Sequence, residues 1–145
     1  MLHIQVGSPV RLLPDRWTRL AAPGGTVLLA ATVVGYVGAV DPNQAGHYPT
    51  CPFLFVTGLY CPGCGSLRAV HALAHGDVPE ALSRNPLTVL SVPLLVALWV
   101  LWTRRRLTGR RRSWAAPGWA IWGLLAVVIA FWILRNLPGF AFLAP

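Results

Sequence analysis

The sequence predicts an all-α membrane protein with three transmembrane helices, and its composition and the placement of its charges support this. Of the 145 residues, 55% are hydrophobic and only 11% are charged, which is unusual for a soluble domain. Three apolar stretches lie between the charged segments. Each approaches the roughly 20 helical residues needed to cross a hydrocarbon core about 30 Å thick. We therefore interpret residues 1–145 as a single membrane domain.

The first predicted span covers residues 20–40. The 19 residues before it contain two prolines and no sustained periodicity, so they are expected to form a basic tether. Arginines followed by an apolar run also fit a signal peptide, but the long leader favours a retained helix. Gly35, Gly38 and Ala39 would let a neighbouring helix approach closely.

Residues 41–86 are predicted to form the outer face, with a cysteine hairpin and two short interfacial helices. The segment 66–75 is amphipathic at the helical period. After it, Asp77 followed by Glu80 matches a capping box, which predicts a second short helix over 78–84.

Two further spans are predicted over residues 87–102 and 115–134. The first of them is short, but Asn85 can cap it with Pro86 at its first position. Pro93 lies inside this span and predicts a kink, because its ring removes a backbone donor.

The arginines predict the orientation. All twelve basic residues are Arg, and nine of them precede the first span or lie in the loop 103–113. Three spans place both groups on one face, which is cytoplasmic by the positive-inside rule. We therefore expect a bacterial plasma membrane protein with its N-terminus in the cytoplasm and its C-terminus outside. The loop is expected to contact anionic lipid headgroups, and not nucleic acid, through Arg104, Arg105, Arg106, Arg110, Arg111 and Arg112.

All three cysteines lie in the outer region, where chemistry is most expected. The turn Cys61-Pro-Gly-Cys64-Gly brings two thiols to the same side of a tight bend. Cys51 lies ten residues upstream. Sulfur atoms placed in this way can share a metal ion or form a disulfide.

A set of short motifs resembles an uncharacterised family of small bacterial, chiefly actinobacterial, membrane proteins with a domain of unknown function. The resemblance implies a shared fold and no activity. Ser66 replaces the Thr usual in that family and keeps the hydroxyl group. The motifs are Cys51-Pro-Phe, Thr57-Gly58, Cys61-Pro-Gly-Cys64-Gly, Arg68, Gly76, Asn85-Pro86 and Arg135-Asn136-x-Pro138-Gly139.

Three interpretations of the cysteines remain open. In the first, which we prefer by a small margin, Cys51 forms a structural disulfide with Cys61 or Cys64, although this leaves an odd thiol. In the second, the three thiolates bind zinc, as in a zinc knuckle. A histidine would then complete the shell, and the candidates are His47, His71 and His75.

The third interpretation is redox catalysis. A Cys-x-x-Cys pair before a helix favours thiolates. Arg68 lies one turn further on, so Cys61 and Cys64 could form a catalytic pair with Cys51 as the resolving thiol. Arg68 itself is expected to pair with a nearby carboxylate or to bind a carbonyl of the cysteine turn.

The sequence carries no nucleotide-binding loop, carboxylate pair or serine nucleophile motif. The predicted function is therefore a non-enzymatic accessory or scaffold subunit of a membrane assembly, without a cofactor, and its partners are lipids and other membrane subunits or copies of itself. The alternatives are a membrane thiol-disulfide oxidoreductase and a metal-binding membrane protein.

Overall fold

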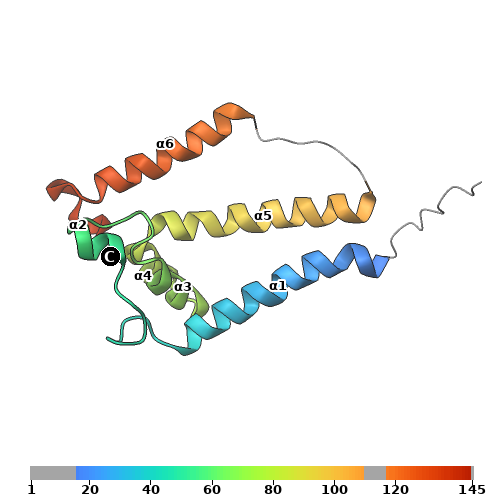
Figure 1. Ribbon diagram of the computed structural model, residues 1–145, viewed down its shortest axis with the longest axis horizontal. Coiled ribbons are helices and arrows are strands. Elements are labelled where there is room, and N and C mark those ends of the chain that lie inside the picture. The colour runs from blue at the N-terminus through green and yellow to red at the C-terminus, as the bar shows by residue number, and fades with distance from the viewer. Residues whose placement is uncertain (1–15, 110–116, 145) are drawn as a thin grey trace, which may run out of the picture.

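The computed structural model describes residues 16–109 and 117–144, and all regular elements in these ranges are helical. The three long helices extend from one end of the molecule, which we call the cysteine end because the cysteine turn and the short helices gather there (Figure 1). The elements are α1 (Arg16–Ala39), α2 (Pro52–Thr57), α3 (Ser66–Ala74), α4 (Val78–Arg84), α5 (Pro86–Thr108), α6 (Gly118–Leu134) and the 3₁₀ segment η1 (Pro138–Leu143).

The starts of α4 and α5 confirm the predicted caps. The side chain of Asp77 accepts a hydrogen bond of 3.0 Å from the backbone N–H of Glu80. Asn85 accepts one of 3.0 Å from the N–H of Thr88, with a proline in the first turn of each helix. These side chains satisfy backbone donors that have no partner inside the helix.

The helix that contains the second predicted span is longer than expected. Residues 87–102 were expected to be followed by an arginine loop at 103–113, but α5 continues to Thr108 and ends at Gly109, which has φ 66°. Leucine and arginine are good helix formers, and no glycine or proline lies between Thr103 and Thr108. α2 is a further short helix that the sequence analysis did not include, since Pro52 suits its first turn and Gly58 ends it with φ 70°.

Two helices, not three, are long and apolar enough to cross a membrane among the described residues. These are Trp17–Ala39 and Pro86–Thr108, each of 23 residues. α6 is strongly apolar but has 17 residues, about 25 Å of helix, because Pro117 precedes it with a non-helical ψ of 142°. Residues 115 and 116 of its predicted range lie outside the described residues.

α1 contacts α5 at the end opposite the cysteines. Arg19 donates a hydrogen bond to the carbonyl of Leu107, and the indole of Trp99 donates one to the Thr26 hydroxyl. At the cysteine end, α3 packs on α1, where a Cβ added at Gly38 would lie 3.2 Å from that of Ala74. This confirms the close approach expected for a small residue at Gly38.

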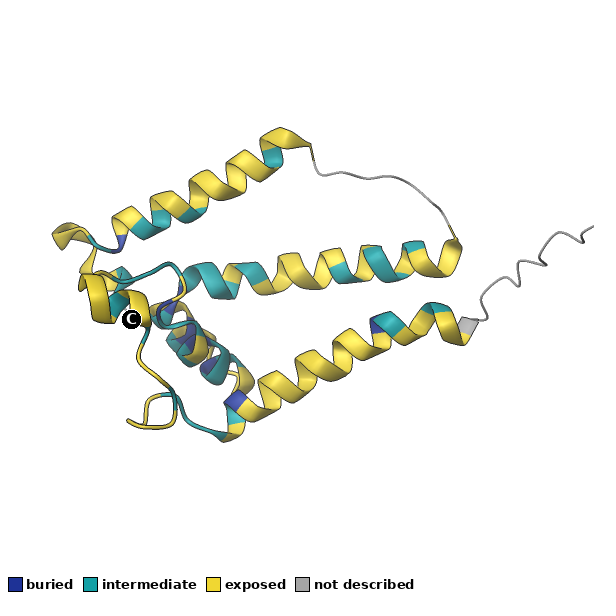
Figure 2. Cartoon of the chain, viewed as in Figure 1, coloured by how far each residue is buried: buried dark blue, intermediate teal, exposed yellow. Residues whose placement is uncertain are grey.

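The small core lies between α3, α4 and α5, where Ala69, Ala72 and Ala81 are buried (Figure 2). The long helices instead expose many large apolar side chains, such as Leu90 at 67% and Trp122 at 71%. Such surfaces are costly in water but suit contact with lipid tails or other apolar helices.

Candidate metal centre

The structure brings the three cysteine sulfurs together. The Sγ atom of Cys61 lies 3.6 Å from that of Cys51 and 3.2 Å from that of Cys64, and all three sulfurs lie within 4.8 Å of one another. All three thiols are free, and these separations exceed the roughly 2.05 Å of a disulfide. Cys64 is buried, whereas Cys51 and Cys61 are half-buried.

The turn that carries two of these sulfurs is closed by local hydrogen bonds. The N–H of Cys64 donates to the carbonyl of Cys61 at 3.1 Å, and the N–H of Cys61 donates to the Cys64 sulfur at 3.3 Å. Gly65 follows in the left-handed region with φ 82°, which a residue with a Cβ rarely adopts, and α3 starts immediately after it.

Arg135 holds the carbonyls of this turn from the end of α6. Its guanidinium donates to the carbonyls of Cys61 at 2.9 Å, Pro62 at 3.3 Å and Cys64 at 3.1 Å. The side chain is only 2% exposed and lies 4.9 Å from the ring centre of Phe131. The rigid fork of donors explains why one arginine can bind several carbonyls at once.

Asn85 holds the same turn from the junction of α4 and α5. Its amide donates to the carbonyls of Pro62 at 2.9 Å and Cys64 at 3.0 Å, while its oxygen caps α5. The residue is 0% exposed. Ser66 lies nearby and shares a hydroxyl hydrogen bond of 2.7 Å with Thr88.

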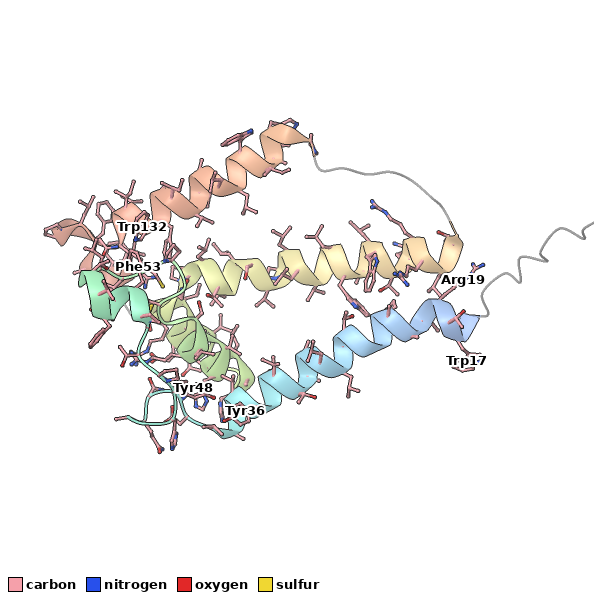
Figure 3. The ribbon with its side chains drawn as sticks, viewed as in Figure 1. Trp17, Arg19, Tyr36, Tyr48, Phe53 and Trp132 are labelled. Atoms are coloured by element: carbon pink, nitrogen blue, oxygen red, sulfur yellow. The ribbon has the colours of Figure 1, made fainter. Side chains whose placement is uncertain are left out.

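A second contact fixes α6 to the segment before the turn. The Asn136 side chain accepts a hydrogen bond from the N–H of Tyr60 and donates one to its carbonyl, both at 2.9 Å. It thus forms the same pair of hydrogen bonds with Tyr60 that the backbone of a neighbouring β-strand would form. The rings of Phe53 and Trp132 also meet edge to face, with their centres 5.8 Å apart. Figure 3 labels these two residues where α2 meets α6. The C-terminal end of α6 is thus part of the cysteine site.

The local environment shifts the pKa values of Cys51 and Cys64 in opposite directions. The backbone N–H of Leu54, followed by the Cys61 thiol, lowers the pKa of Cys51 by hydrogen bonding to its thiolate. Burial raises the pKa of Cys64 to about 12. Burial likewise lowers the pKa of the Arg135 guanidinium, and negative charge on Cys64 or Cys61 opposes that effect.

No carboxylate among the described residues offsets the buried charge of Arg135. Asp41 accepts hydrogen bonds from Asn43, Asp77 caps α4, and Glu80 pairs with Arg84 at 2.7 Å. The Nε atom of Arg135 is buried and has no hydrogen-bond partner in this part of the chain. A buried cation without a counter-charge is costly, so the site favours negative charge beside the guanidinium.

The predicted histidine ligand does not join the cysteines. The cluster of metal-ligating side chains in the described ranges holds only the three cysteines. His71 bonds to the carbonyl of Val37 at 2.8 Å because α3 turns this side chain toward α1. His75 bonds to the His71 carbonyl and His47 to that of Asp41, so none of the three histidines predicted as the fourth ligand lies in the sulfur cluster.

Arg68 lies on the wall of a pocket beside the cysteines, and no hydrogen bond or ion pair joins it to another described residue. The carbonyls expected to bind Arg68 are bound instead by Arg135, whose part in the site the sequence analysis missed. The available signal was the Arg135-Asn136 motif of the family resemblance, in which an arginine followed by an asparagine ends an apolar helix.

The three arginines at the end of α5 lie at the opposite end of the molecule from this site (Figure 1). Arg104, Arg105 and Arg106 occupy the last turns of α5, where Arg106 stacks on Trp102 at 5.0 Å. The other three, Arg110, Arg111 and Arg112, lie outside the described residues.

The fold and the site define a small helical membrane protein with a cysteine cluster. Residues 51–99 match the model of a family described as Protein of unknown function (DUF2752), which confirms the resemblance to an uncharacterised family over this segment. The match contains all three cysteines and Asn85, and Arg135 lies beyond it. No curated protein matches the chain, and no solved structure matches it.

Proposed function

We propose that the protein is a non-enzymatic subunit of a membrane assembly whose cysteine cluster binds a divalent thiophilic metal ion, with zinc as the first candidate. The observation that supports this best is the meeting of three sulfurs beside a buried guanidinium that has no carboxylate partner among the described residues. Metal binding would tie together the segment before α2 and the turn before α3.

The sulfur separations suit a tetrahedral metal. With Zn–S bonds of about 2.3 Å, ligands at tetrahedral angles are separated by about 3.8 Å. The measured separations of 3.6 and 3.2 Å, and the limit of 4.8 Å for the third pair, are close to this value. Small side-chain rotations would therefore complete the triangle of ligands.

Charge also favours a divalent ion. Three thiolates and one divalent ion carry a net charge of −1, which the guanidinium of Arg135 would neutralise. A monovalent ion such as Cu⁺ would leave −2. Three thiolates without metal would be strongly disfavoured, since burial already raises the pKa of Cys64 to about 12.

The proposed setting is a membrane with three spans. α1 and α5 would cross it, and α6 would do so together with the residues just before Gly118. The arginines around 16–19 and 104–112 would then face the cytoplasm and its anionic lipids, and the cysteine end would lie outside. The exposed apolar helix faces support lipid or subunit contacts.

Metal analysis tests the proposal. Protein purified from membranes in mild detergent without chelator should contain about one zinc per chain. Each of Cys51→Ser, Cys61→Ser and Cys64→Ser should lose that metal, while Ser66→Ala, a matched hydroxyl change in the same turn, should retain it. Metal-free protein that does not bind added Zn²⁺ or Co²⁺ would refute the proposed function.

A thiol-disulfide oxidoreductase is the second candidate, favoured by the lowered pKa of Cys51. The Cys51 thiolate would attack a substrate disulfide and release one substrate thiolate. The Cys61 sulfur, 3.6 Å away, would then give up its proton, attack Cys51 and release the second. The substrate gains two electrons, and the protein is left with a Cys51–Cys61 disulfide. Catalysed reduction of a model disulfide in the presence of dithiothreitol, abolished by Cys51→Ser, would favour this candidate.

A further inference from the structure

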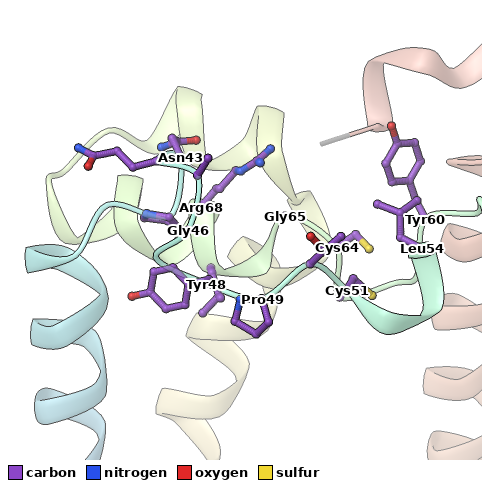
Figure 4. A pocket seen from close by; sticks show the side chains of 16 residues that line it. Asn43, Gly46, Tyr48, Pro49, Cys51, Leu54, Tyr60, Cys64, Gly65 and Arg68 are labelled. Atoms are coloured by element: carbon purple, nitrogen blue, oxygen red, sulfur yellow. The ribbon is translucent and has the colours of Figure 1, made fainter. Parts of the chain in front are cut away.

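A pocket borders the sulfur cluster, and two of the three cysteines line it. Its volume is about 660 Å³, within the range typical of small-molecule sites. The loop 42–51, the cysteine turn and the first turn of α3 line it. In Figure 4, Cys51 and Cys64 lie toward one side of the pocket with Leu54 and Tyr60, and Asn43 and Arg68 lie toward the other.

The pocket wall carries the positively charged side chain of Arg68, which pairs with no carboxylate among the described residues. Arg68 is half-buried there, and within residues 16–109 and 117–144 it makes no ion pair. The three carboxylates in those ranges have other partners: Asp41 accepts from the Asn43 amide, Asp77 caps α4 and Glu80 pairs with Arg84. Asn43 lies on the same wall with its amide bonded to Asp41, so Arg68 alone supplies the wall with an available charged donor. The polar wall is therefore suited to a negatively charged ligand.

The proposed metal would have one coordination position left after binding the three sulfurs. Arg135 donates to the carbonyls of Cys61 and Cys64, so these groups are already paired and are not expected to be ligands. Cys51 and Cys64, by contrast, line the pocket directly. A ligand that enters the pocket can thus approach the metal without displacing a protein group, as in zinc sites that keep one position open.

We propose that this pocket binds a small organic anion, which donates one atom to the open position of the metal and places its carboxylate against Arg68. This inference rests on the proposed metal site. The ligand class is defined by two features at separate ends of one molecule: a nitrogen or sulfur donor and a carboxylate. Arginine suits the second role because its planar donors match a carboxylate geometrically.

The test uses full-length protein in phosphatidylcholine nanodiscs, which contain no anionic headgroup, loaded with Co²⁺ in place of zinc. Thiolate-to-cobalt absorption reports the metal site, and the visible ligand-field bands report the fourth ligand. Three imidazoles with the same donor are titrated: neutral 4-methylimidazole, anionic imidazole-4-propionate and cationic histamine. The anion should bind about tenfold more tightly than the neutral ligand, and histamine should bind most weakly.

Variants assign this preference to one side chain. Arg68→Gln should remove most of the tenfold preference, and Arg68→Lys should keep part of it. Arg84→Gln should leave the preference unchanged, because Arg84 pairs with Glu80 and does not line the pocket. Persistence of the preference in Arg68→Gln, or equal binding of the three imidazoles to cobalt-loaded protein, would overturn the inference while leaving the metal site standing. Absence of thiolate-to-cobalt absorption would refute the metal site itself.

Discussion

Replacing the buried Arg135 should destabilise the cysteine end more than replacing any of the exposed arginines. Arg135→Gln removes a guanidinium that binds the carbonyls of Cys61, Pro62 and Cys64 while only 2% exposed. Glutamine is too short to reach all three acceptors. Hydrogen bonds to charged groups contribute about 1.5–3 kcal/mol each, and contributions within one network do not add fully. We expect a loss of roughly 3–5 kcal/mol in the free energy of unfolding.

For a chain of this length that loss corresponds to a decrease in Tm of roughly 10 °C. The assay is thermal unfolding in detergent, followed by the reactivity of the buried Cys64 thiol with a fluorescent maleimide. Arg84→Gln is the matched control, because it removes an exposed i,i+4 pair worth about 0.3–0.5 kcal/mol. A Tm for Arg135→Gln within 2 °C of this control, a margin of roughly 1 kcal/mol, would refute the reasoning.

Three further predictions concern the cap, the pH dependence and the topology. Asn85→Ala should lower the free energy of unfolding by about 2–4 kcal/mol, since it removes a helix cap and two hydrogen bonds to buried carbonyls. Asn85→Ser should recover about 1 kcal/mol by restoring the cap. Equal losses in both variants would show that the cap does not contribute to the stability. Zn²⁺ affinity should rise at least tenfold per pH unit between about pH 6 and 8, because binding must displace the proton of Cys64, whose pKa is about 12; competition titrations that give a pH-independent affinity would exclude Cys64 as a ligand. Single-cysteine variants at Asn43 and Thr108 should react with impermeant reagents on opposite sides of an intact membrane, and labelling on one side only would exclude the proposed three-span topology.

The sequence predicted the local features of the fold well. Asp77 and Asn85 marked the starts of α4 and α5 because a cap depends on residues within one helical turn. The apolar stretches likewise located all three long helices. Periodicity did not show where α5 ends, because a run of arginines is compatible with either a helix or a loop. In the structure α5 continues through the arginines and ends at Gly109.

The candidate site was predictable only in part. The three cysteines were identified from their spacing, but their meeting depends on how α2 is placed against the turn. Arg135 is 71 residues from Cys64, and no local pattern indicates which carbonyls it binds. His71 illustrates the same limit, since its position in the sequence allowed a ligand role but the packing of α3 on α1 turns its side chain to the carbonyl of Val37.

The position of Arg135 near the end of the chain affects the order in which the site can form. At a synthesis rate of about 5–20 residues per second, Arg135 follows Cys64 by roughly 4–14 seconds. During that interval the cysteine turn lacks the side chain that binds its carbonyls, and its thiols are accessible to oxidants and to stray metal ions. A nascent chain that stops before α6 would keep its sulfurs in this unprotected state. Correct assembly therefore depends on how quickly the last helix is inserted, relative to how quickly free thiols react in the compartment that receives them.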